Sequence, residues 1–88
     1  MTKKEKHQLI NTAFCDKYEN DFDIEDEMGG RLVLTPFEFE GNQVDNTIDY
    51  HMSRHTVDVY NWSTPEIKAI AEEMEVFLES LMKKYDLE

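Results

Sequence analysis

Two histidines and two aspartates within ten residues are the part of this sequence whose types and spacing could do chemistry. Asp49, His51, His55 and Asp58 all lie in the segment NTIDYHMSRHTVDVYNW, residues 46–62. Histidines four residues apart bind zinc together when a helix brings them onto one face, and a histidine beside a carboxylate is a common acid–base pair. The secondary structure that carries these residues decides whether either chemistry is available.

The alternation of polar and apolar residues in this segment predicts a β-hairpin rather than a helix. With the tip at residues 53–54, Tyr50 lies opposite Val57, and Asp49 lies opposite Asp58. A slip of one residue would mix the polar and apolar side chains of the two strands, so the pattern favours this register.

In this register the two histidines point to opposite faces of the sheet. His55 falls on the apolar face, and His51 falls on the polar face beside Asp49 and Asp58. The histidines then cannot share a metal ion, and no other residues have the spacing of a metal-ligand set. The sequence also offers no nucleophile with a base and no glycine-rich phosphate loop. It therefore predicts no metal, no cofactor and no enzymatic activity.

The preceding residues predict a first hairpin that turns at Gly41-Asn42. Its polar face carries Glu38 opposite Asp45, with Glu40 alongside. Opposed like charges destabilise a sheet by a few tenths to about 1 kcal/mol per pair, so stability alone does not explain them. Two aromatic residues at the end of the last strand add large contact side chains. The expected partner-binding residues are Glu38, Glu40, Asp45, Asp49, His51, Asp58, Tyr60 and Trp62.

Helical periodicity predicts two helices around these strands, one over residues 3–19 and one after Pro65. The acidic segment before Gly29 fails as a calcium loop and is interpreted as a solvated connector. The predicted fold is α+β, in the order α-β-β-β-α. It is a three-stranded antiparallel meander, strands 31–40, 43–52 and 55–62, with both helices packed on one face. Residues 1–88 form one compact domain, and Leu87-Glu88, interpretable as a vector-derived scar, receive no structural weight.

Charge narrows the classes of partner. Twenty acidic and nine basic residues give a net charge of −11, so nucleic acid and anionic membranes are repelled and a basic protein is attracted. The element order is similar to that of double-stranded-RNA-binding domains, but those need basic residues where this chain has Glu66, Glu72 and Glu73. Cys15 is the only cysteine, and the lack of a partner for it favours the reducing cytoplasm.

The leading hypothesis is a small acidic binding module whose partner is a basic protein, including nucleic-acid-binding proteins. In its sharpest form, this is a phage or mobile-element protein whose carboxylates imitate a row of phosphates. Acidity that only keeps the protein soluble remains an alternative. The expected oligomeric state is a monomer or a homodimer. Another alternative is a structural or assembly protein that self-associates through its C-terminal amphipathic helix. A domain with no assignable function is the last alternative.

Overall fold

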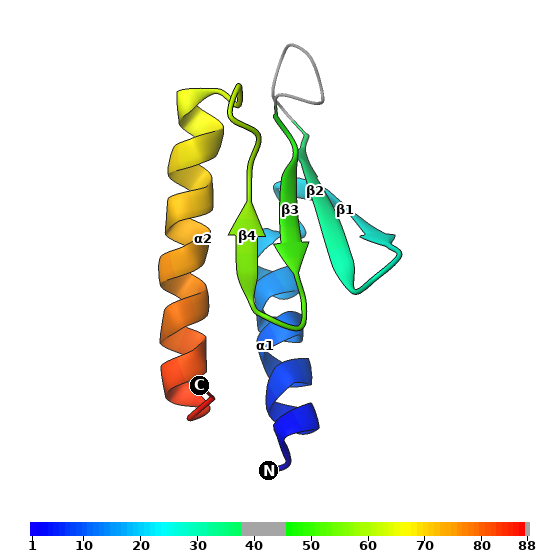
Figure 1. Ribbon diagram of the computed structural model, residues 1–88, viewed down its shortest axis with the longest axis vertical. Helices are drawn as coiled ribbons and strands as arrows, with labels where there is room; N and C mark the ends of the chain where they lie inside the picture. The colour runs from blue at the N-terminus through cyan, green and yellow to red at the C-terminus, as the bar shows by residue number, and fades with distance from the viewer. Residues whose placement is uncertain (38–45, 88) are drawn as a thin grey trace.

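The computed structural model describes residues 1–37 and 46–87. Four strands pair antiparallel in chain order to form one sheet, and two helices accompany it (Figure 1). The elements are α1 (Lys3–Tyr18), β1 (Phe22–Glu27), β2 (Arg31–Pro36), β3 (Ile48–His51), β4 (Thr56–Asp58) and α2 (Pro65–Lys84). The predicted α+β class is confirmed, whereas the prediction of three strands in the order α-β-β-β-α is wrong.

The additional strand is β1, the acidic segment that was interpreted as a solvated connector. Phe22 is buried and Ile24 half-buried, while Asp23 and Glu25, which alternate with them, are exposed. This alternation is the period of two of a half-buried strand. Gly29 and Gly30 have φ angles of 87° and 75° and form the turn into β2. Glycine adopts this left-handed conformation without a Cβ clash, so the pair closes a hairpin.

Helix α1 begins with the predicted capping box. The Thr2 side chain accepts the Glu5 N–H at 3.1 Å, and the Glu5 carboxylate accepts the Thr2 N–H at 3.2 Å. The buried row of the helix is Ile10, Phe14 and Tyr18. Cys15 follows Phe14 directly, at the side of this row, and is half-buried against the core.

Helix α2 begins as the sequence predicts, with Thr64 accepting the Ile67 N–H at 3.3 Å and Pro65 at the first helical position. Its core-facing residues are buried, and α2 runs alongside β4 (Figure 1). Within residues 1–37 and 46–87, neither helix combines the length and the apolar character needed to cross a lipid bilayer.

One hydrophobic cluster joins both helices to one face of the sheet. Tyr50 of β3 is fully buried, and its ring stacks on that of Phe14 with centroids 4.1 Å apart. The sheet residues in the cluster alternate along each strand: Phe22, Leu32, Leu34, Ile48, Tyr50 and Val57. Because neighbouring residues of a strand point to opposite faces, the residues between these occupy the other face of the sheet.

Leu87 belongs to this core, so the expectation that residues 87–88 carry no structural weight is wrong for Leu87. After the last turn of α2, Asp86 adopts a φ of 54°, and the N–H groups of Asp86 and Leu87 donate to Lys83 O and Met82 O. This pair of hydrogen bonds is a Schellman motif, which turns the chain back across the helix end. It buries Leu87 to 5% exposure.

Leu87→Ala is expected to lower the free energy of unfolding by about 2 kcal/mol, the low end for a buried leucine, because Leu87 lies outside the helices and strands, where the backbone can relax. Urea unfolding followed by far-ultraviolet circular dichroism measures this change. Val76→Ala is the control, since Val76 is 67% exposed on α2 and its truncation should change stability by less than about 0.5 kcal/mol. Equal stability of both variants would contradict the docking of the chain end.

Candidate functional site

The face of the sheet opposite the core is strongly acidic. Cross-strand partners share a face, so the register places Asp23, Glu25 and Glu27 of β1 on the same side as Asp49 of β3 and Asp58 of β4. The cationic groups among them are Arg31 and His51. We call this set of seven residues the acidic face. Its five carboxylates and one guanidinium sum to a charge of −4 when His51 is neutral.

The predicted opposition of Asp49 and Asp58 is confirmed by the register of β3 and β4. Each carboxylate also has a basic side chain as a neighbour. Asp58 Oδ2 lies 2.6 Å from His51 Nε2, and Asp49 Oδ2 lies 3.9 Å from the Arg31 guanidinium. These contacts offset part of the repulsion between the aspartates, and the exposed pairs contribute at most about 1 kcal/mol each.

Three of the predicted partner-binding residues, Glu38, Glu40 and Asp45, lie outside the described residues, as does the turn predicted at Gly41-Asn42. Their predicted place beside Asp49 and Asp58 stays a prediction.

The carboxylates of β1 were not among the predicted site residues. Asp23, Glu25 and Glu27 alternate with Phe22 and Ile24, and this alternation in the sequence is the signal of a strand with one wet face. They supply three of the five carboxylates of the acidic face. Within the described residues, none of the three forms an ion pair.

The two aromatic residues lie beyond the sheet rather than on it. Strand β4 ends at Asp58, because a turn closed by the Ser63 N–H and the Tyr60 carbonyl, 3.0 Å apart, leads the chain into α2. The rings of Tyr60 and Trp62 stack with centroids 4.9 Å apart and planes 11° apart. Trp62 is 60% exposed and so does not pack under α2.

His55 lies on the core side, as the register predicts, and belongs to a polar cluster between α1 and the β3–β4 hairpin. Its Nε2 lies 2.6 Å from His7 Nδ1, and its Nδ1 lies 2.8 Å from the Tyr50 hydroxyl. The Tyr50 hydroxyl also donates to Asn11 Oδ1. His7 and Asn11 are four residues apart and therefore share one face of α1. Only the hairpin half of this cluster was apparent in the sequence.

The hydrogen-bond pattern of this cluster fits a neutral His55. Since Tyr50 donates its proton to Asn11, His55 Nδ1–H donates to the Tyr50 oxygen, and the Nε2 of a neutral His55 accepts the His7 Nδ1–H. Burial, followed by the neighbouring His7, lowers the pKa of His55 to about 4. Burial also raises the pKa of the Tyr50 hydroxyl. His55 and the Tyr50 hydroxyl are therefore uncharged at neutral pH, and the cluster joins α1 to the hairpin.

His51 and His55 are not arranged to bind one metal ion together. His51 and His55 point to opposite sides of the sheet, and within the part of the chain that the structure describes, no three His, Cys, Asp or Glu side chains gather closely enough to hold a metal ion. Burial and then the charges of Asp16 and Glu19 raise the pKa of the Cys15 thiol, which disfavours the reactive thiolate.

The chain shows no significant match to protein-family models, curated proteins or solved structures. Its function is therefore inferred from its own surface. The alternative of self-association through α2 needs apolar side chains on the surface of this helix. Ile67, Met74 and Leu81 are instead buried in the core of the same molecule. Among the described residues of α2, the apolar side chains still exposed are Ala69 and Val76.

Proposed function

We propose that this protein is a non-enzymatic binding module that docks on a basic protein through its acidic face. The observation that carries the proposal is the gathering of five carboxylates from three strands on a face that neither helix covers. With strands about 4.8 Å apart, the carboxylates span about 14 Å from β1 to β4. Charge spread over this distance produces a field that attracts a basic surface and speeds its association.

Stability does not account for this arrangement. Asp49 and Asp58 face each other across two strands, where a threonine or a lysine on either side would remove the repulsion. The β1 carboxylates Asp23, Glu25 and Glu27 follow one another at about 6.8 Å along the strand. Departures from the rules of local stability concentrate at functional sites, which supports a binding role for the face.

The stacked rings of Tyr60 and Trp62 support the same proposal. Both rings are exposed in the connection that follows β4, one of the strands of the acidic face. Tyrosine and tryptophan are the residues that most often carry the binding energy of protein interfaces. We assign them the role of apolar anchors next to the charged surface.

The sharpest form of the proposal is that the partner is a nucleic-acid-binding protein and that the carboxylates take the place of phosphates. A basic groove that binds phosphates through counterion release also attracts a carboxylate row. Duplex DNA should then compete with this protein for its partner. The lone Cys15 suits a reducing compartment, so the cytoplasm is where we expect the partner.

Affinity capture from a lysate of the source organism, followed by titration of the captured protein, tests the proposal. The triple variant Glu25→Gln, Asp49→Asn, Asp58→Asn is expected to bind the partner at least about tenfold more weakly, because three charges at the interface are removed. Raising the salt concentration from 50 to 500 mM should also weaken binding by wild type about tenfold or more, because the added ions screen the attraction between the acidic face and the basic partner.

The matched control removes the same number of charges from α2, by Glu66→Gln, Glu75→Gln and Glu79→Gln, and should bind within about threefold of wild type. Equal losses in both triple variants would show that net charge, and not the acidic face, determines binding. Binding that is insensitive to salt would contradict the proposal, and competition by duplex DNA separates the mimic from an ordinary basic-surface binder.

A further inference from the structure

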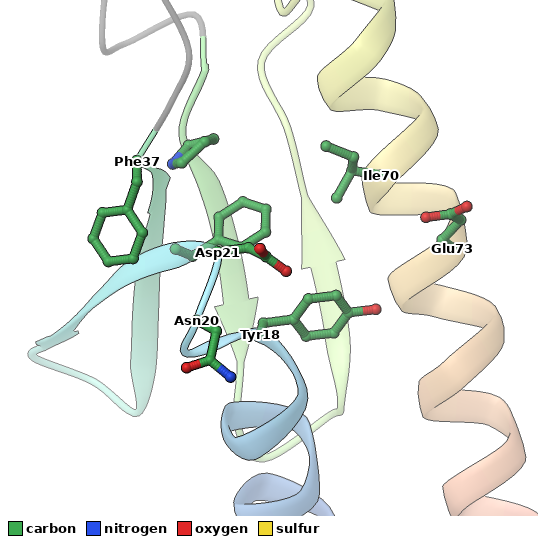
Figure 2. Close-up of a pocket in the computed structure, with 8 residues that line it drawn as sticks. Tyr18, Asn20, Asp21, Phe37, Ile70 and Glu73 are labelled. Carbon is green, nitrogen blue, oxygen red and sulfur yellow. The ribbon is translucent and has the colours of Figure 1, made fainter.

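A cavity of about 360 Å³ lies on the helix side of the molecule, away from the acidic face. It is enclosed by the end of α1, the start of β1, the end of β2 and the middle of α2 (Figure 2). This volume is at the lower end of the range of about 300–1,000 Å³ that is typical of ligand sites. The lining residues are Tyr18, Asn20, Asp21, Phe22, Pro36, Phe37, Ile70 and Glu73.

Backbone hydrogen bonds fix the wall of this cavity on the sheet side. The Asp21 N–H donates to the Tyr18 carbonyl at 3.1 Å and so closes the turn between α1 and β1. The Asp21 carbonyl in turn accepts the Phe37 N–H at 3.1 Å, which ties the start of β1 to the end of β2. The backbone N–H and C=O of Asp21 are therefore both hydrogen-bonded, so this wall of the cavity is preformed.

The polar groups of the cavity are anionic or neutral. Asp21 contributes a carboxylate from the sheet side, and Glu73 contributes another from α2 (Figure 2). Burial, and then the charge of Glu73, raises the pKa of the Tyr18 hydroxyl, which keeps this group neutral and shows that Glu73 acts on it electrostatically. Among the described residues, no lysine, arginine or histidine lines the cavity, and neither carboxylate forms an ion pair.

The remaining walls are apolar and largely aromatic. Phe22 and Tyr18 are buried at its base, and Ile70 is directed into it from α2 (Figure 2). The ammonium group of Lys17 lies 4.6 Å from the centroid of the Phe77 ring and 5.8 Å from that of Tyr18. The chain thus already holds one of its own cations against these rings, which is the attraction that a ring face exerts on a positive charge.

We propose that this cavity binds the side chain of an arginine presented by another peptide or protein. A guanidinium group is planar and weakly hydrated, so it can stack on the Phe37 ring, which is 60% exposed, while its N–H groups reach the Asp21 and Glu73 carboxylates. Its aliphatic stem suits the contact with Phe22 and Ile70. A lysine ammonium carries the same charge but cannot stack, and an anion is repelled by both carboxylates. This inference does not depend on the acidic face.

Titration of the protein with Nα-acetyl-arginine amide, followed by NMR, tests the inference. The resonances of the Ile70 methyl groups and of the Tyr18 and Phe22 rings should shift, with binding in the millimolar range. Nα-acetyl-citrulline amide has the same shape without the charge and should bind at least about fivefold more weakly. The double variant Asp21→Asn, Glu73→Gln should lose affinity for the arginine derivative by a similar factor, with its remaining spectrum unchanged.

The variant Glu25→Gln, Asp49→Asn is the control, since it alters the acidic face and should bind the arginine derivative within about twofold of wild type. The inference is overturned if citrulline binds as well as arginine, if the shifts map to the acidic face, or if no resonance of the cavity moves. If the cavity binds the arginine derivative as expected but the capture experiment finds no partner for the acidic face, this inference is supported and the proposed function is contradicted.

Discussion

Acidifying the solution from pH 7 to pH 4 is expected to lower the free energy of unfolding by up to about 3 kcal/mol through His55 alone. Burial and the neighbouring His7 lower the pKa of His55 from 6.5 to about 4. Between these values the unfolded chain binds a proton at this position and the folded chain does not. Stability therefore falls as the pH drops from 6.5 towards 4, and the contribution of His55 levels off below pH 4.

The surroundings of His55 show why burial dominates. The hollow beside the hairpin is also lined by Arg54 and by Glu72, Glu75 and Glu79 of α2, and these carboxylates would favour a protonated ring. The pKa is nevertheless lowered, because His55 is only 4% exposed and lies against His7.

Urea unfolding of wild type and His55→Asn at pH 7, 6, 5 and 4 isolates this effect. Asparagine suits the φ of 55° at this position, so the substitution adds little backbone strain. The acidic residues titrate in both proteins, and their contribution cancels in the difference. The gap in unfolding free energy between the two proteins should narrow by about 3 kcal/mol from pH 7 to pH 4. A constant gap would show that folding does not change the proton affinity of His55.

Phe14→Ala is expected to lower the free energy of unfolding by about 3–5 kcal/mol, the largest effect of a single substitution that we anticipate. Phe14 is fully buried, stacks on Tyr50, and lies 4.9 Å from the ring of Tyr18. Its removal leaves a cavity where α1 meets the sheet. For a domain of this size the loss is a large fraction of a total stability on the order of 5–10 kcal/mol.

The matched control is Phe37→Ala, the same substitution at a ring that is 60% exposed, where the change should stay within about 0.5 kcal/mol. Far-ultraviolet circular dichroism is the suitable probe, because Trp62 is 60% exposed and its fluorescence reports weakly on the core. Similar losses for the two variants would contradict the central place of Phe14.

The helices and the second hairpin were predictable because several local signals agree at each. The capping residues Thr2 and Thr64 and the apolar stripes of both helices all indicate the same elements, and the structure has them. The register of β3 and β4 followed from matching Tyr50 with Val57 around a short turn, since a slip of one residue mixes polar with apolar side chains.

Strand β1 was not predicted because its acidity outweighed its periodicity. Six residues that include four acids have low intrinsic strand propensity, and only the pairing with β2 stabilises them in extended form. Half of the polar cluster was missed for a related reason. His7 and His55 are 48 residues apart, so their contact depends on how α1 docks, which the sequence pattern does not specify.

Strand β1 lies at one edge of the sheet. Among the described residues it pairs only with β2, so its outer backbone N–H and C=O groups are open to another strand. Unpaired strand edges are where folded chains stack into aggregates, and charged side chains are a common protection against this. Asp23, Glu25 and Glu27 would place like charges side by side if the same edge of a second copy paired with β1, which disfavours such pairing.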